Sequence, residues 1–246
     1  MIKFGTSGWR GVIGEDFTFE NVRVATQGIA NYLRKTGQKG TGVVVAYDTR
    51  FLSEKFASEA ARMLAFNGIR AFLCNRDVPT PCAAFETTRR KAMAAINFTA
   101  SHNPPEYNGL KFSTATGAPA LPEVTKAIER EIHLVQEKNE RIDLYEKREL
   151  IEEIDPKDRY LNELRTKIDS DVLRNSGLRI AIDSLYGTSR DYLDYFLLES
   201  GAEVKIIHNY RDPYFGGFSP ECNEKNLGEL RKIVSNEKYD IGLATV

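Results

Sequence analysis

Residues 92–112 read AMAAINFTASHNPPEYNGLKF and give the chain its clearest structural pattern. The apolar run Ala92–Phe98 predicts a buried strand, and Leu110–Phe112 predicts the start of the next strand. Each proline of Asn103-Pro104-Pro105 pushes the residue before it towards extended geometry, so the segment between the strands is not helical. Asn108-Gly109 predicts a tight turn, because both residue types tolerate positive φ. We therefore expect a rigid loop at the end of a central strand, where α/β proteins place their chemistry.

Outward from this loop, strand-like and helix-like segments alternate along the chain. Apolar runs typical of buried strands cover residues 42–47 and 69–74. The predicted helices run from Val22 to a stop at Gly37, from a Ser53 cap to Asn67-Gly68, from a Thr80-Pro81 start towards Arg90, and from about Pro122 to Asn139. Such alternation predicts an α/β fold.

A highly charged segment, residues 140–156, separates two parts of the chain. It ends in Asp155-Pro156, and we interpret it as a boundary between a first domain at 1–145 and a second at 155–246. At 246 residues the chain is long enough for two ordinary domains or one large one.

The strand pattern then starts again in the second part. Gly42 lies six residues before Asp48, and Gly177 lies six residues before Asp183. A helical stretch and a further strand follow in both parts. The spacing suggests two related, consecutive units, while chance resemblance between any two strand–helix–strand units is an equally open explanation on spacing alone.

The composition excludes several classes of function. The 34 basic and 35 acidic residues nearly cancel, so neither a nucleic-acid partner nor a membrane surface is expected. No apolar stretch approaches the roughly 20 residues of a membrane-spanning helix, and no signal-peptide pattern opens the chain. The histidines are scattered, so a histidine-based zinc or iron site is not expected. The three cysteines form no C-x-x-C pair and are interpreted as buried side chains in a reducing compartment, the cytoplasm.

Ser101 is the candidate nucleophile of the central loop, and three interpretations compete. A serine hydroxyl is weak at its free pKa and needs a base, a metal or prior modification. His102 is the adjacent base, but neighbouring residues of an extended chain point opposite ways and the hydrolase pattern G-x-S-x-G is absent. Ser101 is otherwise a polar loop residue, or it carries a phosphoryl group, a dianion with three strong acceptor oxygens.

Four segments resemble one enzyme family, in the same order along the chain. They are Phe4–Gly11 (FGTSGWRG), Tyr47–Arg50 (YDTR), Val78–Pro81 (VPTP) and Thr99–Pro104 (TASHNP) with the YNGLK that follows. Together they resemble the N-terminal part of the α-D-phosphohexomutases, the phosphoglucomutase/phosphomannomutase family. The resemblance implies three-layer α/β/α domains with mixed sheets.

The resemblance also implies a reaction and its residues. The whole enzyme would interconvert hexose 1-phosphate and hexose 6-phosphate through a hexose 1,6-bisphosphate, which also serves as activator. Ser101 would carry the phosphoryl group and bind Mg²⁺ through it, and Lys111 would act as general acid and base. Arg10, between Gly8 and Gly11, would bind phosphate, while His102 and Asn103 would shape the loop around the phosphoryl group. The alternatives are a phosphoglucosamine mutase and a non-catalytic phosphosugar-binding relative.

Asp48 and Arg50 are predicted to form a structural ion pair near the serine loop, and Thr6 and Ser7 to satisfy loop groups. Residues 239–246 predict a strand, after which the family carries a metal-binding D-x-D-x-D-R loop. No such triplet occurs in the chain, and Asp169-Ser170-Asp171 is interpreted as a helix cap. We therefore expect a fragment that is inactive alone, while the identity of the sugar and the oligomeric state stay open.

Overall fold

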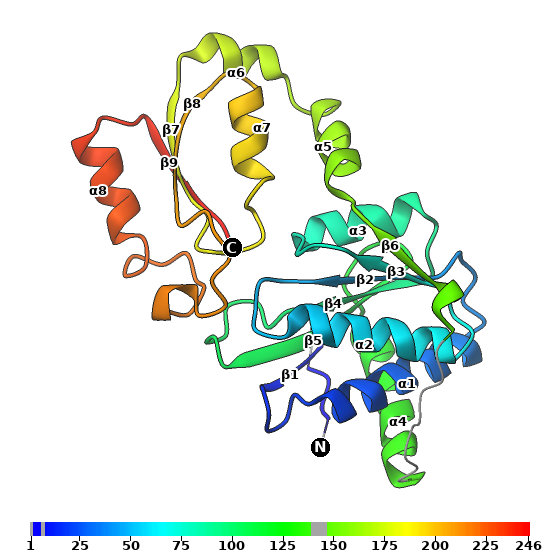
Figure 1. Cartoon of the computed structure of the whole chain (residues 1–246). Coiled ribbons are helices and arrows are strands. Elements are labelled where there is room, and N and C mark those ends of the chain that lie inside the picture. The colour runs from blue at the N-terminus through cyan, green and yellow to red at the C-terminus, as the bar shows by residue number, and fades with distance from the viewer. Residues whose placement is uncertain (1, 6–7, 139–146) are drawn as a thin grey trace. The chain divides into compact units, whose positions relative to one another are not determined.

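The computed structural model describes residues 2–5, 8–138 and 147–246, which form two compact units (Figure 1). The first unit comprises Met1–Asp48, Leu52–Ser101 and Glu106–Pro156, and the second comprises Thr49–Phe51, His102–Pro105 and Lys157–Val246. Each unit has its own sheet. Thr6, Ser7 and the predicted domain end at residue 145 lie outside the described residues.

The first unit is built on a six-stranded sheet in the order β1-β5-β4-β2-β3-β6. Its strands are β1 (Trp9–Val12), β2 (Val43–Tyr47), β3 (Ala71–Cys74), β4 (Ala94–Phe98), β5 (Tyr107–Thr114) and β6 (Ile151–Ile154). β5 runs antiparallel to β1 and β4, while β2 pairs in parallel with β3 and β4, and β3 with β6. All residues of β2 and β4 are buried, as in central strands covered on both faces. The predicted α/β fold with a mixed sheet is confirmed for this unit.

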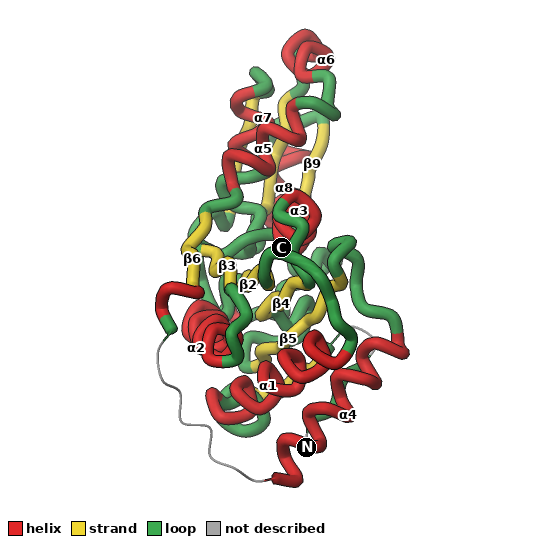
Figure 2. Tube along the Cα trace, turned by 90° about the vertical axis from the view of Figure 1, so that its right-hand side faces the viewer, coloured by secondary structure: helices red, strands yellow, loops and turns green. Residues whose placement is uncertain are grey.

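Helices cover both faces of this sheet. Figure 1 shows α1 (Phe19–Lys35) and α2 (Ser53–Phe66) on one side and α3 (Thr80–Arg89) on the other. α4 (Pro122–Lys138) lies alongside α1, as Figures 1 and 2 both show. On the α2 side, the ring of Phe17 packs against Phe56 at 4.9 Å and Phe98 at 6.3 Å between centroids. These contacts join the sheet to its helices and form the core of a three-layer unit.

The helix ends agree with the predictions more closely than the helix starts. Gly37 and Gly68 follow the ends of α1 and α2 in the left-handed conformation, with φ of 61° and 75°. Ser53 was predicted to cap α2 but is its first helical residue, and Leu52 occupies the N-cap position. Thr80 is likewise the first residue of α3, with Pro79 at the N-cap. The Ser53 hydroxyl bonds to Asp48 and Asn108, and the Thr80 hydroxyl bonds to Asn97. Local rules for helix starts do not consider such tertiary partners.

The charged segment interpreted as a boundary contains a strand of the first sheet. A short 3₁₀ helix at Arg148–Leu150 leads into β6, which pairs in parallel with β3 at the sheet edge. Glu152 of β6 accepts a hydrogen bond from Arg90 at 3.1 Å, so its charge is paired across the edge. Charged residues are common on edge strands because they discourage pairing with other chains. The first unit therefore continues to Pro156.

The second unit contains a three-stranded sheet in the order β8-β7-β9. Its elements in chain order are α5 (Lys157–Arg165), α6 (Ser170–Ser176), β7 (Arg179–Asp183), α7 (Leu193–Glu199), β8 (Glu203–Ile207), a 3₁₀ turn (Phe215–Gly217), α8 (Gly228–Asn236) and β9 (Ile241–Ala244). The described strands are all parallel, so the mixed sheet expected here is not seen. Asp169 caps α6 as predicted, its carboxylate accepting from the N–H groups of Asp171 and Val172.

The two units repeat one plan. In the first, β2–α2–β3–α3–β4 places β2 between β3 and β4; in the second, β7–α7–β8–α8–β9 places β7 between β8 and β9. Asp48 follows β2, and Asp183 ends β7. The order of strands, added to the spacing of the glycines and aspartates, supports the prediction of two related, consecutive units.

Candidate active site

Ser101 is held in a strained backbone conformation just beyond the end of β4. Its φ of 58° lies in the left-handed region, which costs a non-glycine residue roughly 1–2 kcal/mol. Its backbone N–H donates to Thr99 Oγ1 at 3.0 Å, and the Thr99 N–H donates to the Gly109 carbonyl at 2.9 Å. Strain that neighbouring contacts impose on one loop residue is frequent at functional sites, and Ser101 is such a residue and is half-buried. The extended-chain argument used against His102 does not apply here, because the backbone at Ser101 is not extended.

Arg50 fixes the part of the loop that follows. Its side chain is fully buried and donates to the carbonyls of Asn103 at 2.7 Å and Pro104 at 2.8 Å. The guanidinium lies 5.1 Å from the centre of the Phe215 ring. Arg211 donates to the Arg50 carbonyl at 3.3 Å, within the same compact unit. Charge-assisted bonds to two successive carbonyls restrict the loop beside Ser101, a role that the predicted ion pair with Asp48 did not anticipate.

Asp48 takes part in a second network at the end of β2. Its Oδ1 accepts from Ser53 Oγ at 2.9 Å, and that hydroxyl accepts from Asn108 Nδ2 at 2.8 Å. Asn108 is fully buried in β5, and its Oδ1 also accepts from the Gly109 N–H at 2.8 Å. The network therefore joins the end of β2, the start of α2 and β5, so it fixes the strand that carries Lys111.

The tight turn predicted at Asn108-Gly109 is wrong. Both residues lie within β5 and pair with β1, Asn108 opposite Gly11 and Gly109 opposite Arg10. A Cβ on Gly109 would lie 2.5 Å from the Thr99 carbonyl oxygen and 2.9 Å from that of Trp9. The glycine is required because the backbones of β1 and the serine loop both approach it closely.

Arg10 and Lys111 share one face of the sheet. Arg10 of β1 lies opposite Gly109, Lys111 lies two residues further along β5, and side chains two apart on a strand point to the same face. Lys111 in turn lies opposite Asn97 of β4, so Asn97 belongs to this face as well. Both cationic side chains are half-buried. The predicted residues Ser101, Lys111 and Arg10 thus come from three adjacent strands or their ends.

Gly8 brings the N-terminal segment against β5. Its φ is 122°, and a Cβ there would lie 2.2 Å from the Leu110 carbonyl oxygen and 2.9 Å from Lys111 Cα. Arg10 itself lies in β1, directly after Gly8 and Trp9, so the pairing of β1 with β5 positions its backbone. The opening motif therefore packs on the strand that carries Lys111.

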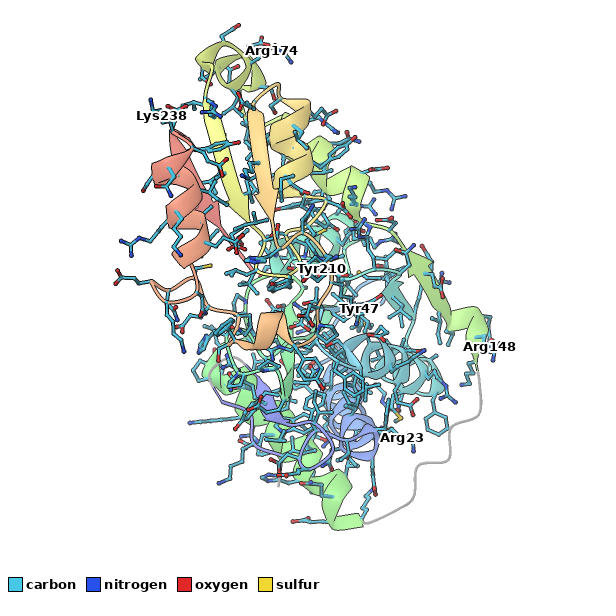
Figure 3. The ribbon with its side chains drawn as sticks, turned by 60° about the vertical axis from the view of Figure 1, so that its left-hand side comes forward. Arg23, Tyr47, Arg148, Arg174, Tyr210 and Lys238 are labelled. Atoms are coloured by element: carbon cyan, nitrogen blue, oxygen red, sulfur yellow. The ribbon has the colours of Figure 1, made fainter. Side chains whose placement is uncertain are left out.

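The second unit has its own polar cluster at the carboxyl end of β7. Asp183 is fully buried, and its Oδ1 accepts from the Leu185 N–H at 2.8 Å and lies 2.9 Å from His208 Nδ1. Leu185 and His208, with Tyr186, line a cavity of about 150 Å³. Burial, followed by a hydrogen bond with Tyr210, raises the pKa of Tyr186 to about 12 and keeps its hydroxyl protonated. Figure 3 shows Tyr210 at the opposite end of this unit from Arg174 and Lys238.

The described residues add few other reactive groups. They contain no group of three or more His, Cys, Asp or Glu side chains placed to hold a metal ion. Cys74 and Cys82 are buried as predicted, whereas Cys222 is exposed. None of the helices in the described ranges combines the length and apolar character needed to cross a bilayer.

Fold and site together define a protein of two consecutive, related α/β domains with a strained serine loop. Residues 1–139 match the domain described as phosphoglucomutase/phosphomannomutase, alpha/beta/alpha domain I, and residues 158–245 match domain II of the same description. The chain belongs to the phosphoglucomutase/phosphomannomutase family, as the four motifs suggested.

Individual relatives agree with this assignment. The chain is 32% identical over 244 residues to a probable phosphoglucosamine mutase of Methanosphaera stadtmanae, covering 98% of this chain and 52% of that protein. It is 30% identical to a phosphoglucomutase/phosphomannomutase of Thermococcus kodakarensis, covering 98% and 52%. A crystal structure of a putative phosphomannomutase from Thermus thermophilus superposes with a TM-score of 0.90 at 34% identity, covering 99% of this chain and 54% of that one. The chain thus spans about half the length of these relatives.

Replacing Gly109 with alanine is expected to destabilise the first unit by about 1–3 kcal/mol, because a methyl group there overlaps two backbone oxygens. Urea unfolding followed by fluorescence tests this, since Trp9 is the chain's one tryptophan and is buried in β1. Gly5→Ala is the matched control, because its new Cβ would meet only ordinary contact, 3.6 Å from the Gly8 carbonyl oxygen. An unchanged midpoint for Gly109→Ala would contradict the close approach of the strands.

Proposed function

We propose that the protein containing this chain is a phosphohexomutase whose Ser101 carries the phosphoryl group that is transferred. The observation that carries the proposal is the fixed, left-handed Ser101 beside a sheet face bearing Lys111 and Arg10. A phosphoserine needs a proton carrier and cations near its transferring group, since the transition state spreads charge over the phosphoryl oxygens. Phosphosugars are the substrate class, and the free cysteines favour a cytoplasmic location.

In the proposed reaction, the free hydroxyl of a hexose phosphate attacks the phosphorus of phosphoserine 101. A P–O bond to the sugar forms as the bond to Ser101 Oγ breaks. The hydroxyl proton passes to the Lys111 amine, which gives a proton to the departing serine oxygen. The hexose 1,6-bisphosphate then turns over and returns its other phosphoryl group to Ser101, with the proton passing through Lys111 in the opposite sense. Arg10 offsets charge, and Asn103 with His102 shapes the loop.

Mg²⁺ is the cofactor we propose, with the phosphoserine supplying one ligand. Mg²⁺ favours octahedral oxygen coordination and usually takes carboxylates as well as phosphate. The residues of the described ranges do not fit a complete site, because they hold no group of three carboxylate, histidine or cysteine side chains. Ser101 is therefore the one residue of this chain that we assign to the metal, and the reaction above is derived from the side chains alone.

Two sugar specificities have support among the relatives. The name phosphoglucosamine mutase belongs to relatives at 32% and 29% identity, which favours a glucosamine phosphate. The names phosphomannomutase and phosphoglucomutase belong to relatives at 34% and 30%, which favours mannose or glucose phosphates. A non-catalytic phosphosugar-binding protein is the alternative from another class.

Phosphorus NMR of the full-length gene product that contains this chain tests the proposal. Glucose, mannose and glucosamine 1-phosphates are supplied one at a time with Mg²⁺ and a catalytic amount of the matching 1,6-bisphosphate. We expect one or more to be converted to the 6-phosphate, and EDTA to stop the conversion. Binding of a phosphosugar without conversion of any would favour the non-catalytic relative and reject the mutase.

A further inference from the structure

Asn97 is a buried amide on the face that carries Lys111. Its side chain lies in the middle of the sheet and is 5% exposed. The amide Nδ2 donates to Thr80 Oγ1 at 3.1 Å, at the first residue of α3. The amide Oδ1 is fully buried and accepts no hydrogen bond from the described part of the chain.

An unsatisfied buried acceptor needs a physical reason. Leaving it without a donor costs the desolvation of the group, and an apolar side chain of similar size would avoid this loss. Asparagine is also disfavoured in strands, so neither sheet propensity nor core packing explains the residue. Its cross-strand neighbours are Ala46 on β2, which has no side-chain donor, and Lys111 on β5. Lys111 is therefore the neighbour whose side chain can supply a donor.

The geometry of the antiparallel pair suits such a bond. Asn97 and Lys111 are directly opposite, which places their Cβ atoms about 4.5–5.5 Å apart on one face. The amide donates through Nδ2 to Thr80 Oγ1, which leaves Oδ1 as its remaining polar atom. An ammonium has three donors and no acceptor, so it matches Oδ1 and would be repelled by the NH₂ end of an inverted amide.

We propose that Asn97 is a positioning residue whose Oδ1 accepts a hydrogen bond from the Lys111 ammonium while Lys111 carries the transferred proton. The inference rests on the proposed function for its catalytic meaning, since Lys111 is the proposed proton carrier. Its structural content is independent of that function. The bond is stronger with the charged ammonium than with the neutral amine, so it favours retention of the proton between the two transfers. The strand register also places Arg10 on this face, and its positive charge disfavours the positive charge of the Lys111 ammonium.

Amine labelling of the chain itself tests the bond without any mutase assay. Trace acetic anhydride labels only neutral amines, so the labelling rate at Lys111 against pH gives its pKa. The exposed Lys39 is the internal standard, and mass spectrometry of the peptides is the readout. In Asn97→Leu the acceptor is lost, and we expect the Lys111 pKa to fall by about one unit, with roughly tenfold faster labelling at a fixed pH below it. In Asn97→Asp a carboxylate faces the ammonium, and labelling should slow.

Thr80→Val is the control that separates positioning from packing. It removes the partner of Nδ2 but leaves Oδ1, so labelling of Lys111 should stay within about twofold of wild type. Trp9 fluorescence confirms that each variant is folded. If Asn97→Leu does not fold, the slower labelling expected in Asn97→Asp tests the proposal. Labelling that is unchanged in both Asn97 variants overturns the proposal. So does equal acceleration in Asn97→Leu, Asn97→Asp and Thr80→Val, which would make Asn97 an anchor for α3. The full-length protein could lack mutase activity while Lys111 labelling still accelerates in Asn97→Leu and slows in Asn97→Asp. That outcome would reject the proposed function and support this inference.

Discussion

Replacing Ser101 with alanine is expected to leave the full-length protein unable to accept a phosphoryl group and to abolish mutase turnover. The hydroxyl is the proposed acceptor, and alanine offers no oxygen to replace it. Alanine has the same left-handed penalty as serine at a φ of 58°, so the backbone strain of the site is kept. Incubation with a hexose 1,6-bisphosphate followed by peptide mass mapping should find phosphate at residue 101 in wild type only.

Two further serine variants make this test specific. Ser113 lies half-buried on β5 in the same unit, and Ser113→Ala should take up phosphate normally. Ser101→Gly should be as inactive as Ser101→Ala but more stable by about 1 kcal/mol, because glycine adopts positive φ without penalty. Normal turnover in Ser101→Ala, or phosphate found solely on another residue of the wild type, would reject Ser101 as the phosphoryl carrier.

The elements that follow local rules were predictable from the sequence. β2 and β4 are short apolar runs in which every side chain is buried, so their composition alone identifies them. Gly37 and Gly68 end α1 and α2 because the left-handed position after a helix favours glycine. The repetition of strand–helix–strand units along the chain also follows from the alternation of such elements.

The predictions that were wrong concern residues whose structure depends on contacts between distant parts of the chain. Asn108-Gly109 has the composition of a turn, yet Gly109 sits in β5 because two other backbone segments approach it. β6 is rich in charge and is a strand because it completes the edge beside β3. Ser53 does not cap its helix because Asp48 and Asn108 engage its hydroxyl. Each outcome depends on tertiary partners that no local pattern contains.

The candidate site also combines features that the sequence predicted with features that depend on tertiary contacts. The motifs identified Ser101, Lys111 and Arg10, but not the left-handed backbone that holds the serine. The ion pair expected between Arg50 and Asp48 stays a prediction, while the donation of the Arg50 guanidinium to two carbonyls more than fifty residues away was not predicted. Asn97 lies within the apolar run Ala92–Phe98, and the sequence patterns predicted no role for it. A polar residue within a predicted central strand, close to a catalytic motif, is the signal that would have found it.

Replacing Lys111 with methionine is expected to lower kcat by about 10²- to 10⁴-fold, the loss typical of an acid/base group. Methionine keeps most of the length of the side chain and removes the exchangeable proton. Methionine also removes the proposed donor to the buried Asn97 Oδ1, so the free energy of unfolding should fall by about 1–3 kcal/mol, as measured through Trp9 fluorescence. Steady-state kinetics of the full-length enzyme on its preferred hexose 1-phosphate gives kcat directly.

Lys111→Arg separates proton transfer from charge. A guanidinium keeps the positive charge beside Arg10 but does not lose its proton at physiological pH, so it cannot act as a base. If Lys111 transfers protons, Lys111→Arg should be nearly as slow as Lys111→Met, and both should retain phosphate uptake at Ser101 at a reduced rate. If Lys111 only neutralises the phosphoryl group, Lys111→Arg should recover most of the activity. A Lys111→Met enzyme with normal kcat would reject both roles. Another side chain near Ser101 would then have to carry the proton.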